Sequence, residues 1–184
     1  MASVTTPLMD AALQNSFGDT GERFQTSELF HEIPAPVDPH CQAMAALWRE
    51  LCPPDGLPAR GDFTFERLRA IGVLGNTFVI EPIGAHPDYG TDWRYRLMGT
   101  NIAWMFGSDP TNIPFSQHFL PDEARVCIDF SNQVAQSRRP VFLIGRLRSG
   151  DFSGTLETMS LPILAPDGET VWLLGVSFAA ADRD

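Results

Sequence analysis

The apolar positions of the chain change their period several times, and these changes predict where strands and helices lie. Trp93, Tyr95 and Leu97 alternate with arginine or methionine, which predicts a strand with one face against a core. The alternation stops at Gly99, and the crowded apolar residues of 101–106 predict a short helical turn pressed onto the sheet. A strand that leads directly into an aromatic-rich turn builds a concave apolar wall, which suits the binding of a ligand or partner.

A longer apolar stripe predicts the strongest helix, from Asp38 to Leu51. Asp38 is a good N-cap, and proline is favoured at the first helical position, which Pro39 occupies. The spacing i, i+3, i+4, i+7 puts four side chains on one face of this helix: Met44, Leu47, Trp48 and Leu51. The stripe either covers the back of the sheet or meets the same stripe of a second copy in a homodimer, and both interpretations stay open.

Two further helices and five strands follow. A short helix is expected after Asp62 as its N-cap, and a long one begins at Pro121 and ends before Pro140. β-rich segments predict strands at 76–83, 93–98, 141–148, 155–164 and 170–180, with a long loop at 84–92. The Pro-Asp-Gly sequence at 166–168 predicts a tight turn between the last two strands. The order is an α+β arrangement with helices inserted between the second and third strands.

Composition and charge limit the function classes. A length of 184 residues suits one domain, assigned to 38–184, after an N-terminal extension at 1–37 that is poor in large apolar side chains. The formal net charge of −10 disfavours nucleic acid and anionic membrane surfaces as partners. Neither a membrane-spanning run nor a secretory signal is found, so a cytoplasmic location is expected. The three cysteines lack the spacing of a disulfide framework or zinc site, and no metal is expected.

Short motifs along the chain carry a resemblance to a known family. They are Leu47-Trp48 with Pro53, Leu57-Pro-Ala-Arg60, Asp62-Phe63, Tyr95-Arg-Leu97 with Gly99-Thr100, Phe106-Gly107 with Asp109-Pro-Thr111, Arg139-Pro140, Leu161-Pro-Ile-Leu164 with Asp167-Gly168, and Leu174-Gly175. In this order and spacing, over about residues 44–178, they resemble the PAS sensor fold. More narrowly, they are similar to a largely bacterial family of single PAS domains long catalogued as uncharacterised.

The resemblance implies a PAS-like five-stranded antiparallel sheet, with helices that enclose a pocket on one face and an N-terminal helical extension. It also implies a regulatory, non-catalytic role in signal transduction, often through dimers. Since no kinase or cyclase segment follows Asp184, a signal is expected to leave through a surface, a partner or a dimer.

Six residues are predicted to line the pocket: Arg96, Trp104, Phe106, His118, Phe130 and Trp172. Arg96 beside Trp104 and Phe106 would anchor a carboxylate or fatty-acid head group, unless it is a solvated arginine on the outer face. His118 lies where some haem-binding PAS domains place an axial ligand, although an ordinary hydrogen-bonded loop histidine is the simpler interpretation. Cys127 lacks the motif of flavin-reactive PAS domains. No cofactor, and neither haem nor flavin, is therefore expected.

Three functional hypotheses remain. The first is a regulatory domain that binds a protein partner, or a small apolar or aromatic ligand that biases such binding. The second is a pure interaction module whose pocket is filled by its own tryptophan and phenylalanine side chains. The third is a small α+β enzyme with a cone-shaped pocket, in which His118 would pair with Asp122 or Asp129. No convincing catalytic constellation supports the enzyme.

Overall fold

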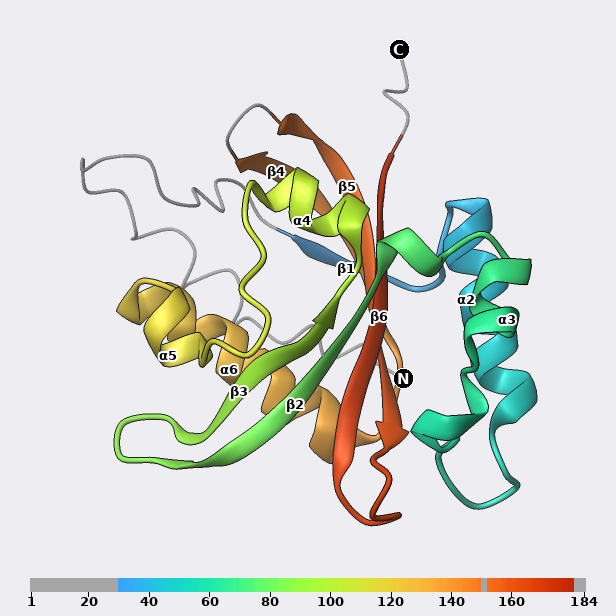
Figure 1. Ribbon diagram of the computed structural model, residues 1–184, viewed down its shortest axis with the longest axis horizontal. Coiled ribbons are helices and arrows are strands. Elements are labelled where there is room, and N and C mark those ends of the chain that lie inside the picture. Colours follow the sequence, from blue (N-terminus) through green and yellow to red (C-terminus); the bar gives the residue numbers. More distant parts are fainter. Residues whose placement is uncertain (1–29, 150–151, 181–184) are drawn as a thin grey trace, which may run out of the picture.

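A computed structural model describes residues 30–149 and 152–180, and its centre is one antiparallel sheet with helices against both faces (Figure 1). The spatial order of the strands is β1-β4-β5-β6-β2-β3. The strands are β1 (His31–Ile33), β2 (Thr77–His86), β3 (Gly90–Met98), β4 (Val141–Ser149), β5 (Phe152–Leu164) and β6 (Val171–Ala179). The α+β class is confirmed.

The strand count differs from the prediction, because the sheet has six strands rather than five. The additional strand, β1, pairs with the outer edge of β4 through His31↔Ile144 and Ile33↔Phe142. It lies within the 1–37 segment that was expected to be an extension, and residues 1–29 of that segment lie outside the described residues. A strand of three residues is too short to show a period of two, which explains why the sequence did not predict it.

The helices cover opposite faces of the sheet (Figure 1). On one face lie α2 (Pro39–Leu51) and α3 (Phe65–Ala70), and on the other lie α4 (Thr100–Phe106), α5 (Phe115–His118) and α6 (Pro121–Ser137). Two short 3-10 helices, η1 (Arg60–Asp62) and η2 (Leu74–Asn76), flank α3. Successive residues of β2 alternate between the two cores: Phe78 and Ile80 belong to the α6-side core, and Val79 to the α2-side core.

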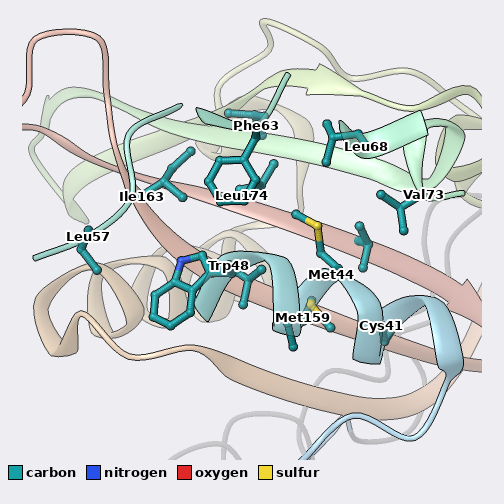
Figure 2. Packing of buried hydrophobic residues seen from close by; sticks show 14 residues of the cluster. Cys41, Met44, Trp48, Leu57, Phe63, Leu68, Val73, Met159, Ile163 and Leu174 are labelled. Atoms are coloured by element: carbon teal, nitrogen blue, oxygen red, sulfur yellow. The ribbon is translucent and has the colours of Figure 1, made fainter. Parts of the chain in front are cut away.

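Helix α2 begins and docks as its sequence predicts. The Asp38 carboxylate accepts hydrogen bonds from the backbone N–H groups of His40 at 2.8 Å and Cys41 at 3.2 Å, which makes Asp38 the N-cap. Met44 and Trp48 are buried against the sheet, as Figure 2 shows, while Leu47 and Leu51 are half-buried at the edge of the same core. Of the two roles left open for this stripe, the covering role is the one that the structure shows.

Buried polar contacts fix α2 to the sheet. The carboxylate of Glu157 on β5 accepts hydrogen bonds from the backbone N–H groups of Val37 and Asp38, each at 2.8 Å. At the other end of α2, Trp48 Nε1 donates to the carbonyl oxygen of Pro162 at 2.8 Å. Since β4 pairs with β5 only as far as Ser160, the indole gives the Pro162 carbonyl the partner that the sheet does not supply.

The structure corrects the start of α3. Asp62 was expected to be the N-cap, but the cap is Thr64, whose hydroxyl oxygen accepts a hydrogen bond from Arg67 N at 3.3 Å. The Asp62 carboxylate instead accepts from Ala59 N at 2.8 Å and closes η1. Both residues can accept from a backbone N–H, so the sequence pattern alone does not choose between them.

The β2–β3 hairpin is longer than expected and contains a β-bulge. Residues 84–92 were predicted to be a loop, but Gly84↔Asp92 and His86↔Gly90 are paired positions of the two strands. Further along, Val79 pairs with Leu97 and Ile80 with Tyr95, which leaves Arg96 as an extra residue on β3.

Candidate functional site

The face of the sheet under α4–α6, where the pocket was expected, is occupied by packed side chains. Its buried members are Phe78, Ile80, Trp93, Ile102, Met105, Phe115, Ala124, Ile128, Val134, Leu147, Leu156 and Leu173. The ring of Phe115 lies between Tyr95, at 5.1 Å between centroids, and Phe119, at 5.3 Å. Such spacings are those of favourable aromatic pairs. Every buried side-chain nitrogen and oxygen of the described residues has a hydrogen-bond partner, so none of these atoms awaits a ligand.

Polar contacts tie α5 and α6 to β3 on this face. The Asp92 side chain, which is buried, accepts a hydrogen bond from the Ser116 hydroxyl at 2.6 Å and from Trp93 N at 2.7 Å. Trp93 Nε1 donates to Asn132 Oδ1 at 3.0 Å. These contacts place α5 and α6 over the strand.

Four of the six predicted pocket residues lie on the α4–α6 side, but they do not form one lining. Trp104 is 69% exposed, and its ring makes a T-shaped contact with that of Phe152, at 6.1 Å between centroids. Phe106 and Phe130 are half-buried at the border of the core. His118 is half-buried with its ring 4.6 Å from that of Phe119, and desolvation lowers the pKa of its imidazole.

The other two predicted residues, Arg96 and Trp172, contact each other on the α2 side. The guanidinium carbon of Arg96 lies 5.1 Å from the centroid of the Trp172 ring, within cation–π distance. The structure thus brings Arg96 to Trp172 rather than to Trp104 and Phe106. The six predicted residues are divided between the two faces of the sheet.

Arg96 belongs to an arginine cluster, which consists of Arg60, Arg94 and Arg96 with Glu81 and Trp172. Glu81 is 6% exposed, and its Oε1 accepts a hydrogen bond from Arg94 Nε at 2.8 Å and lies 2.7 Å from Arg94 Nη2 in an ion pair. Arg96 Nη1 lies 3.3 Å from the Oε2 of the same carboxylate. A buried carboxylate needs such charge-assisted partners.

Arg60 adds a third guanidinium to the cluster. Its Nη1 donates to the carbonyl oxygen of Phe63 at 3.1 Å, and no carboxylate within the described ranges forms an ion pair with it. Desolvation, and then repulsion by Arg96, lower the pKa of Arg60. Sequence reasoning missed Arg60, Arg94 and Glu81; the available signal was that Arg94 and Arg96 share one face of a strand at i and i+2.

The candidate catalytic groups are dispersed. Asp122 and Asp129, the proposed partners of His118, are both exposed on α6. Burial raises the pKa of the Cys127 thiol to about 12, and burial followed by the charge of Glu157 raises that of Cys41 still further, so neither thiol is ionised at neutral pH. No group of three or more metal-ligating side chains is found in the part of the chain that the structure describes.

A shallow hollow of about 190 Å³ lies away from these residues, between the 34–36 linker, α2 and β4. Its lining includes Pro36, Trp48, Arg49 and Phe142. Two of its polar groups already have partners, because Trp48 Nε1 donates to the Pro162 carbonyl and Arg49 Nε donates to the Ala45 carbonyl at 3.1 Å. The hollow therefore offers mainly apolar contact.

Comparison with known families supplies an independent assignment. The model of the family described as PAS domain matches residues 37–178, which is more than half of the chain. No match was found among curated proteins, and none among solved structures. None of the helices that the structure describes is both long and apolar enough to span a bilayer.

Proposed function

The chain belongs to the PAS domain family, and from this premise we propose that it is a cytoplasmic regulatory module that acts by binding a protein partner. PAS domains are in general sensory or regulatory modules. A fold alone does not define a function, so the proposal also depends on what the sheet and its helices offer to a ligand or partner.

The observation that carries the proposal is the filled interior under α4–α6. Side chains of the domain itself, including Phe78, Trp93 and Phe115, occupy the face that would otherwise hold a ligand. This supports a module without a resident haem or flavin, in which contact between proteins transmits the signal. A small apolar or aromatic ligand would tune partner binding only by displacing these side chains.

A non-enzymatic role is part of the same proposal. The exposed positions of Asp122 and Asp129 on α6 and the raised pKa of Cys127 support it, because a general acid–base pair or a thiolate nucleophile needs a shared, desolvated site. His118 would then serve as a packing residue against Phe119.

Native mass spectrometry of the protein purified without denaturant, compared with its denatured mass, tests the filled interior. We expect equal masses per chain. A reproducible mass excess that disappears on denaturation would contradict the filled module and identify a sensor with a retained ligand. The same spectrum reports whether the protein is a monomer or a homodimer.

Crosslinking in the native cells tests partner binding. The tagged chain is crosslinked, purified under denaturing conditions and compared with a variant, Leu174→Asp, that places a charge at a fully buried position of the sheet and so unfolds the domain. We expect one protein to be recovered with the wild type and depleted with the variant. Recovery of the same proteins in equal amounts with both would contradict a specific regulatory partner.

A further inference from the structure

The surface of β3 on the α2 side extends beyond the helices, and the described part of the chain leaves it uncovered. Leu97 is 39% exposed, and the side chains of Arg94 and Arg96 are 33% and 52% exposed. Trp172 and Glu81 form the inner border of this surface. The last pair between β2 and β6 is Ile80↔Leu173, and Glu81 and Trp172 are the adjacent residues just beyond that pair.

The β-bulge makes this surface continuous. Arg94 pairs with Glu81 and Leu97 pairs with Val79, and directly paired residues share a face of a sheet. Without the extra residue, Leu97 would point to the opposite face from Arg94, because they are three positions apart. The bulge therefore adds an exposed apolar side chain to the guanidinium groups.

The position of Arg60 follows from strand pairing. Ala59 forms a bridge with Leu164, and Leu164 N donates to the Pro58 carbonyl at 2.9 Å. The residue before Leu164, Ile163, pairs with Trp172, so η1 begins near the ring that supports Arg96. Arg60 and Arg96 thus approach the Trp172 region from two sides.

The cluster carries a net positive charge in an acidic protein. Arg60, Arg94 and Arg96 contribute three positive charges and Glu81 one negative charge, whereas the whole chain has a formal net charge of −10. Of these arginines, Arg96 makes its bonds to Glu81 only through Nη1, and a guanidinium has five donor hydrogens. Arg96 therefore has hydrogen-bond donors left for an anion. A bound anion would also reduce the repulsion between Arg60 and Arg96.

We propose that the arginine cluster binds a carboxylate presented by an acidic peptide segment of a protein partner, with Leu97 contacting an apolar residue of that segment. The inference rests on the proposed function, since it defines the chemistry of the partner. Charge complementarity selects this occupant: the acidic surface elsewhere repels such a segment, and the guanidiniums attract it. The exposed Leu97 favours a peptide over a free anion, which has no apolar group to place there.

Fluorescence anisotropy with a labelled hexapeptide of alternating glutamate and leucine tests the site directly. We expect Arg96→Gln and Arg60→Gln each to weaken binding by roughly tenfold, which corresponds to about 1.4 kcal/mol. Arg139→Gln, an exposed residue after α6, is the control that removes the same charge without affecting the cluster. Equal affinities of the Arg96 and Arg139 variants would overturn the proposal, as would equal binding of a glutamine–leucine peptide.

Two further measurements distinguish a carboxylate from a phosphate group and a protein partner from a second copy of the chain. Tighter binding of a phosphoserine–leucine peptide would overturn the carboxylate assignment, and a dimer that is lost in Arg96→Gln would show that a second copy occupies the surface. In the crosslinking experiment, recovery of the partner with Arg96→Gln would contradict the arginine cluster as the binding surface, while the proposed regulatory function would still hold. Failure of the wild type to recover any partner, with peptide binding intact, would instead contradict the proposed function.

Discussion

The two faces of the sheet are built from different side chains and are held in different ways. The α2-side core is mostly aliphatic and sulfur-containing, and buried polar groups connect it to the helix, as in the Glu157 contacts with Val37 and Asp38. The α6-side core is richer in aromatic residues, many of them half-buried at its border, and rings such as those of Phe115 and Tyr95 contact each other.

On the α2 side, hydrogen bonds attach a helix to the sheet, whereas on the α6 side, side chains fill the space between the sheet and its helices. Hydrogen bonds that the Glu157 carboxylate accepts and the Trp48 indole donates hold both ends of α2 in one position, because they need defined distances and angles. Under α4–α6, several aromatic residues are half-buried at the border of the core, Phe106 and Phe130 among them. The hydrogen bonds of Asp92 to Ser116 and of Trp93 to Asn132 on this side join two side chains, whereas those of Glu157 and Trp48 reach backbone groups. Side chains can rotate together and apolar contacts are not directional, so we expect the α6 side to tolerate rearrangement better than the α2 side.

Trp48→Ala is the largest expected change and tests whether α2 is part of the fold. It removes a buried indole and leaves the Pro162 carbonyl without its donor, so we expect a loss of about 3–5 kcal/mol in the free energy of unfolding. Chemical denaturation measures it. Trp104→Ala, at a tryptophan that is 69% exposed, is the control and should cost well under half as much. Similar losses in both variants would show that α2 does not cover the sheet.

Glu157→Gln tests the polar attachment of α2. The carboxylate accepts two backbone hydrogen bonds through separate oxygens, and an amide has only one acceptor oxygen, so we expect a loss of about 1–3 kcal/mol. Urea denaturation gives the stability, and hydrogen exchange should show faster exchange at Val37 and Asp38. Glu169→Gln, in the exposed β5–β6 turn, is the control. No change in exchange at these two amides would refute the attachment.

Asp92→Asn makes the corresponding change on the α6 side. Its carboxylate accepts from Trp93 N and from Ser116, but an asparagine can keep the first bond and reorganise the second with the rotatable hydroxyl. We expect a loss of about 1 kcal/mol by the same denaturation experiment, with the exposed Asp88→Asn as control. A loss larger than that of Glu157→Gln would reverse the comparison between the faces.

The smallest expected effect is a pH dependence from His118 on the α6 side. Desolvation lowers the pKa of His118 in the folded protein below its ordinary value of 6.5. The unfolded chain therefore binds the proton more readily, and this contribution to stability is lost as the pH falls through 6.5. We expect His118→Gln to reduce slightly the stability lost between pH 7.5 and 5.5, and NMR titration to give a lowered pKa. His31→Gln, at an exposed histidine of β1, is the matched control.

Much of the fold could be predicted because its signals are local. The N-cap Asp38, the ends of α6 and the β5–β6 turn, where Gly168 has φ of 76°, depend on neighbours in the sequence. β1 could not be predicted, because its three residues form a strand only by pairing with β4, more than a hundred positions later. The choice of Thr64 over Asp62 as a cap likewise depended on η1.

The candidate site was less predictable, since it depends on contacts between distant segments. Arg96 and Trp172 were both singled out, but their contact requires β2 and β6 to be neighbours and β3 to contain a bulge. A period of two shows which residues share a face, and a single extra residue changes the face for everything beyond it. The sequence therefore identified two members of the arginine cluster without bringing them together.

The strand order also has a consequence for folding during synthesis. β6 is the last strand of this sheet to leave the ribosome, yet it lies between β5 and β2 and joins the two halves of the sheet. Until Val171–Ala179 has emerged, the apolar stripe of α2 and the hairpin β2–β3 have no complete sheet to cover. Nascent chains of this domain therefore expose apolar surface until β6 is made, and we expect them to depend on chaperones for that interval.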